Sequence, residues 1–205
     1  MRKYLWQLIS LVLLIGLVIT SAGWAEARRL EQLARNALEL SFDSAYTTAY
    51  SELNQLSRVL QGAIERGSLK QGRPDDDIRY HAMKFSAAIA QMQFGEYQAN
   101  AGTSLFFGDN GEQAGMFTGY LLLIEDRLTR QGGQLTADVQ DSFAAVVEEL
   151  DNLTAAWAAG KTPDILREGM SKDEIYLEAA EAREIFDSLR RLNNILDRLQ
   201  QSLGD

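Results

Sequence analysis

The chain has 205 residues and a formal net charge of −9, with 20 Lys and Arg against 29 Asp and Glu. This acidic balance argues against nucleic acid and anionic lipid headgroups as partners, because both repel negative charge. Cysteine is absent and there is a single histidine, which excludes disulfides and thiolate chemistry and leaves little for a metal site or histidine-based acid–base catalysis. We therefore expect no catalytic constellation, no cofactor and no metal.

The first element in chain order is an uncharged stretch from Tyr4 to Ala25, centred on the apolar run 8–19. About 20 residues of helix span the hydrocarbon core of a bilayer, and tryptophan favours the two membrane interfaces. A tryptophan stands near each end of this stretch, so residues 1–25 are predicted to form a transmembrane helix. The residues predicted to anchor the chain are Trp6, Leu13, Leu17 and Trp24.

A cleaved signal peptide is the alternative interpretation, because the basic start, the apolar centre and the small residues of Ala25-Glu26-Ala27 also fit one. The length of the uncharged stretch and the bulky Trp24 beside the small residues favour an uncleaved anchor. In both cases Arg2 and Lys3 favour a cytoplasmic amino terminus, although Arg28 and Arg29 weaken that preference. We expect a single-pass protein of the cell membrane with residues 26–205 outside the cytoplasm.

Residues 26–66 have a helical pattern without proline, and this helix is expected to continue directly from the membrane helix. Its apolar stripe, in steps of three and four, is Tyr46, Ala49, Leu53, Leu56, Leu60 and Ala63. The segment 67–74 is expected to end it, and Asp75 to Asp77 to cap the next helix. The stripe of that second helix is Ile78, Ala82, Phe85, Ile89 and Met92.

Gly108 to Gly111 predicts a tight turn before the third helix. The third stripe is Met116, Phe117, Tyr120, Leu121, Ile124 and Leu128, and Gly132-Gly133 is expected to end it. Thr136 is expected to cap the fourth helix, whose heptad row is Val139, Phe143, Val146, Leu150, Leu153 and Trp157.

The last helix has the clearest start signal, a capping box at Ser171-Lys172-Asp173-Glu174. Its apolar row is Ala182, Ile185, Leu189, Leu192, Leu196, Leu199 and Leu203. Because this row is unbroken to its end, we interpret its later part as a surface for a partner helix. The residues predicted to form this partner surface are Leu192, Leu196, Leu199 and Leu203.

No segment shows the period-two alternation of a strand. The sequence therefore predicts an all-α fold, in which a transmembrane helix (1–25) precedes a bundle domain (26–205) of about five amphipathic helices.

Isolated residues suggest chemistry only weakly. The Asp109 to Glu112 segment lacks the ligand spacing of a calcium loop and is interpreted as a glycine turn. The lone His81 is expected to be a surface or half-buried residue. A small-molecule pocket is one interpretation of Phe42, Tyr46, Tyr50 and Phe85, although aromatic residues at helical spacing more often belong to a core.

The stretch Ser41-Phe42-Asp43-Ser44-Ala45-Tyr46, followed by Glu52-Leu53-Asn54-Gln55-Leu56, resembles the amino-terminal region of the YpeB-like spore-germination membrane proteins. Leu135-Thr136 after a glycine turn, behind the aromatic segment 117–120, also looks like that family. The resemblance covers at most the anchor and the helical region, because the strand-containing PepSY-type domains of the family do not occur in these 205 residues. It implies a protein that holds a cortex-lytic enzyme at the spore inner membrane.

The function predicted from these features is that of a membrane-anchored, non-catalytic scaffold whose partner is a protein, with a cell-wall hydrolase as the class that the resemblance implies. The alternative is an extracytoplasmic sensory module that binds a small ligand and signals through a membrane partner. An enzyme is the least favoured class, since no nucleophile, metal set or histidine pair is evident.

Overall fold

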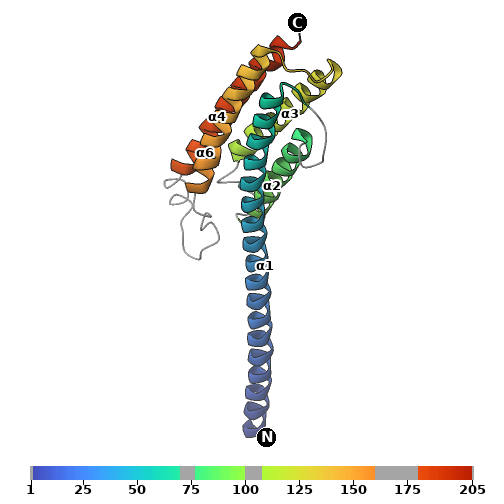
Figure 1. Cartoon of the computed structure of the whole chain (residues 1–205). Coiled ribbons are helices and arrows are strands. Elements are labelled where there is room, and N and C mark those ends of the chain that lie inside the picture. Colours follow the sequence, from blue (N-terminus) through green and yellow to red (C-terminus); the bar gives the residue numbers. More distant parts are fainter. Residues whose placement is uncertain (1, 70–76, 100–107, 160–179, 205) are drawn as a thin grey trace. The chain divides into compact units, whose positions relative to one another are not determined.

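The computed structural model describes residues 2–69, 77–99, 108–159 and 180–204 (Figure 1). These ranges contain only helices, apart from turns and one isolated antiparallel bridge between Ser68 and Gln134. The helices are α1 (Arg2–Arg66), α2 (Ile78–Ala99), α3 (Gly108–Arg130), α4 (Ala137–Ala159) and α6 (Ala180–Ser202). The predicted all-α fold is confirmed.

Helix α1 is unbroken over 65 residues, as the absence of proline and of capping signals before Gly67 predicts. It ends where Gly67 adopts a left-handed conformation with φ of 63°. There the Gly67 amide donates to the Ile64 carbonyl at 3.0 Å, and the Ser68 amide donates to the Ala63 carbonyl at 3.1 Å. These two bonds satisfy carbonyls that the helix end would otherwise leave unpaired.

The chain forms two compact units, Met1–Leu40 and Ser41–Asp205, and α1 contributes residues to both. The predicted boundary at residue 25 marks where the chain would leave a membrane, and it stays a prediction. The structural boundary marks where α1 begins to pack against the other helices.

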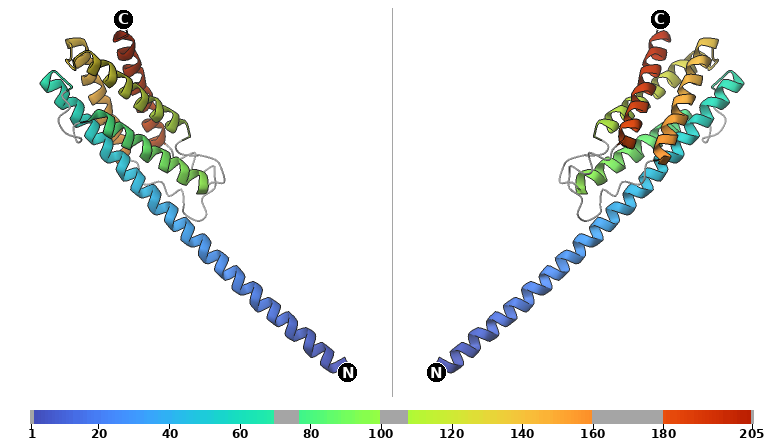
Figure 2. Two further views of the ribbon diagram at one scale, coloured as in Figure 1. Left: turned by 90° about the vertical axis from the view of Figure 1, so that its right-hand side faces the viewer. Right: turned by 90° about the vertical axis from the view of Figure 1, so that its left-hand side faces the viewer.

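The second unit is a helical bundle in which α4 lies beside α6, α6 beside α3, and α3 beside α2 (Figures 1 and 2). The predicted stripes of α1, α2 and α4 are buried throughout. In α3 the stripe is buried except at Met116, which is 41% exposed, and at the half-buried Tyr120. The largest fully buried side chains of the core are Trp157, Phe85, Phe117 and Phe143.

The start of α2 agrees with its predicted cap. The Arg79 amide donates to the Asp77 carboxylate at 2.9 Å, which is the bond expected of an N-cap residue. Asp75 and Asp76, and the capping box at residues 171–174, lie outside the described residues. Helix α4 begins directly after Thr136, as predicted.

The predicted tight turn at Gly108 to Gly111 is wrong, because these residues form the first turn of α3. Gly111 lies against the Gln93 side chain of α2, and a Cβ atom at this position would overlap that side chain. The glycine therefore lies inside the helix beside a flexible side chain of α2 and does not make a turn.

Backbone hydrogen bonds join the segment after α3 to the segment after α1. Gly132 and Gly133 have positive φ angles of 89° and 71°, and they end α3 as predicted. The Leu69 amide donates to the Gly133 carbonyl at 2.7 Å, and the Leu135 amide donates to the Gly67 carbonyl at 2.9 Å. A Cβ on Gly133 would lie 3.2 Å from the Leu69 carbonyl oxygen, so this crossing requires a residue without a side chain.

Replacing Leu192 with Asp should destabilise the bundle severely. Leu192 is fully buried in α6, so the change opens a cavity, which costs about 2–5 kcal/mol, and also buries an unpaired carboxylate. The measurement is urea unfolding of the full chain in detergent, followed by circular dichroism. The control is Asn194→Asp, which introduces the same residue at an exposed position of the same helix. Equal midpoints for the two variants would contradict the buried position of Leu192.

Candidate functional site

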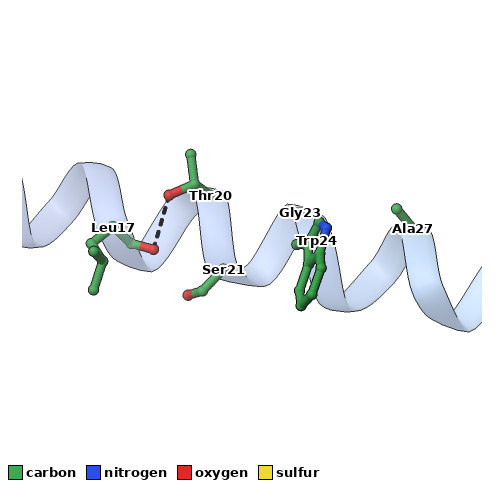
Figure 3. A pocket seen from close by; sticks show the side chains of 6 residues that line it. All are labelled: Leu17, Thr20, Ser21, Gly23, Trp24 and Ala27. Carbon is green, nitrogen blue, oxygen red and sulfur yellow. Dashed lines mark hydrogen bonds between the residues drawn. The ribbon is translucent and has the colours of Figure 1, made fainter.

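The amino-terminal unit has a wide-open, nearly flat pocket along α1 (Figure 3). It is lined by Leu17, Thr20, Ser21, Gly23, Trp24 and Ala27. The Thr20 hydroxyl donates to the Leu17 carbonyl at 3.1 Å, which satisfies the hydroxyl within the helix. Leu17 and Trp24 are 68% and 63% exposed, so the surface they present is apolar and suits contact with an apolar environment.

Charged residues begin at Glu26, within this segment. The Arg28 guanidinium lies 3.8 Å from the centre of the Trp24 ring, a cation–π contact worth about 0.5–1 kcal/mol at an exposed position. Arg29 pairs with Glu26 at 3.9 Å.

Of the four predicted anchor residues, the structure describes the side chains of Leu17 and Trp24. The side chains of Trp6 and Leu13, with most of the apolar run 8–19, lie outside the described part. Within the residues that the structure does describe, no helix is long and apolar enough to cross a membrane. The transmembrane helix therefore stays a prediction.

The predicted partner surface on α6 is wrong for the folded bundle. Leu192 and Leu196 are fully buried and Leu199 is 3% exposed, while Leu203 is half-buried against the core. A period of three and four identifies an apolar face, but α3 and α4 of the same chain already cover this one.

The second site is a buried polar contact that the sequence did not predict. Glu52 of α1 and His81 of α2 are 7% and 5% exposed, and the His81 Nδ1 lies 2.6 Å from the Glu52 carboxylate. The expectation that His81 would be a surface or half-buried residue is therefore wrong. A histidine held by a carboxylate has its ring orientation fixed.

Two partly exposed residues lie at the edge of this contact. The Lys84 ammonium is 3.7 Å from the second Glu52 oxygen and 4.4 Å from the centre of the Tyr80 ring. The Tyr80 side chain, followed by the Glu52 charge, raises the pKa of Lys84, so this lysine remains a cation at all ordinary pH values. Tyr80 also packs edge-on against the His81 ring, with 5.2 Å between ring centres.

Two further buried glutamates connect other pairs of helices. Glu125 of α3 accepts a hydrogen bond from Arg79 of α2 at 3.1 Å. Glu149 of α4 binds Arg191 of α6 through two guanidinium nitrogens, at 2.9 and 2.8 Å. Hydrogen bonding to Glu149 raises the pKa of Arg191. Each buried carboxylate therefore meets a basic side chain from a neighbouring helix.

In the described ranges these contacts pair polar side chains of neighbouring helices. No group of three or more His, Asp or Glu side chains there is placed to hold a metal ion. The Glu52 carboxylate contacts both the His81 ring at 2.6 Å and the Lys84 ammonium at 3.7 Å. The arrangement explains how helices are held together, and it offers no nucleophile next to a base.

The aromatic residues proposed as a pocket are mostly part of the core. Tyr46 packs against Trp157 with ring centres 5.2 Å apart, and its hydroxyl donates to the Trp157 carbonyl at 2.7 Å. Phe85 is fully buried against Phe117, and Tyr50 is 38% exposed. The side chain of Phe42 lies outside the described residues. The core interpretation is confirmed for Tyr46 and Phe85.

The sequence held a partial signal for the Glu52–His81 contact. Each residue directly precedes a member of its helix's buried stripe, Leu53 in α1 and Ala82 in α2, so each lies at the edge of an apolar face. That position predicts partial burial. It does not show that the two edges face each other, because the residues are 29 positions apart.

Comparisons with known proteins give no relative for this chain: no family model, no curated protein and no solved structure matches it.

The Glu52–His81 contact should make a large contribution to stability. Each single substitution removes the 2.6 Å hydrogen bond between two buried side chains, so His81→Ala and Glu52→Ala should each cost about 1–3 kcal/mol. The double variant should cost clearly less than the sum, because both single variants lose the same hydrogen bond. Urea unfolding of the four proteins of this cycle measures the coupling. Lys84→Ala is the control, and because this side chain is half exposed it should lower the midpoint much less. Strictly additive losses would show that the two side chains do not interact.

Proposed function

We propose that this protein is a membrane-anchored, non-catalytic helical scaffold that holds a protein partner outside the cytoplasmic membrane. The observation that carries the proposal is the continuity of α1. Helix α1 runs from Arg2 to Arg66, so the same helix contains the uncharged stretch Tyr4 to Ala25 and the buried stripe Tyr46 to Ala63.

The surroundings of Trp24 support the anchor. An exposed tryptophan with an arginine over its ring, directly after an uncharged stretch, matches the composition of a membrane–water interface. The basic Arg2 and Lys3 at the other end favour a cytoplasmic amino terminus. The bundle is then extracytoplasmic, in a single-pass protein of the cell membrane.

The bundle surface supports a binding role. Met83 of α2 and Leu123 of α3 are 57% and 48% exposed, so each offers apolar surface to a partner protein. The resemblance to the YpeB-like proteins names the partner class, a cell-wall hydrolase, and with it the spore inner membrane and a role in germination. The acidic charge of the chain suits a partner with a basic face.

A sensory module is the second candidate, and the same continuity of α1 favours it. A change in how α2 packs on α1 at the Glu52–His81 contact would act directly on the helix that leads to the membrane. The signal would then pass to a membrane partner. Neighbouring genes discriminate between the candidates, since a hydrolase gene supports the scaffold and a kinase gene supports the sensor.

Leu13→Arg should release the protein from the membrane. A charged residue at the centre of a membrane helix costs about 2.5–3.5 kcal/mol on insertion scales, and Leu13 lies in the middle of the apolar run. Carbonate extraction of membranes, followed by immunoblotting, measures the retained fraction. Gln32→Arg adds the same charge to an exposed position outside the uncharged stretch and should stay in the membrane. Mass spectrometry of the extracted wild type should find Tyr4 and Trp24 in one chain. A mature chain beginning near Glu26 would identify a cleaved signal peptide instead.

Met83→Asp and Leu123→Asp should weaken capture of a co-expressed cell-wall hydrolase by the full chain. Both side chains are exposed, so the substitutions should change the unfolding free energy by only about 0.5 kcal/mol while placing charge on a binding face. Co-precipitation from detergent extracts measures the capture. Gln131→Asp adds the same charge at another exposed position and serves as control. Turnover of cell-wall material by the purified chain alone would contradict the scaffold.

A further inference from the structure

We draw no further inference here: the strongest candidate, the outward apolar face of α3 that carries Gly115, Met116, Gly119 and Leu123, is unpartnered within the described residues, and nothing in the structure shows what covers it.

Discussion

The bundle depends on burial of one face of α1 between Ala45 and Ala63. Ala49, Leu53, Leu56 and Leu60 on this face are completely covered, and they form one core cluster with the stripes of the other helices. Burying a leucine side chain is worth roughly 1.5–3 kcal/mol, so a few of them match the whole net stability of a typical domain. The same face belongs to a helix that begins at Arg2.

Burial of apolar side chains alone would not determine which helices are neighbours, because the apolar stripes of the helices are similarly hydrophobic. The buried glutamates add that information. Glu52 of α1 contacts His81 of α2, and Glu125 of α3 binds Arg79 of α2. Glu149 of α4 binds Arg191 of α6. A misassembled bundle would bury these carboxylates without their partners, which is costly even where the correct pairs contribute little net stability.

Periodicity predicted most of the fold because a helix with one buried face repeats every three to four residues, and the stripes of α1, α2 and α4 show this plainly. Periodicity did not predict which element covers the apolar face of a helix. The leucine row of α6 looked available for a partner, yet α3 and α4 of the same chain cover it. Gly111 was predicted to be a turn residue, but it lies in α3 against the Gln93 side chain of α2. The sequence alone does not show that these two positions meet. The Glu52–His81 contact, across 29 residues, was beyond reach for the same reason.

The chemistry of the side chains on α1 changes from one segment of the helix to the next. Around Leu17 and Trp24 it has apolar residues with few polar groups, which suit lipid. From Leu30 to Leu40 charges separate from a narrow apolar row, which suits a helix in water. From Ala45 onward the apolar residues are buried in the bundle, and the positions that would continue the row are Ser44 and Thr47.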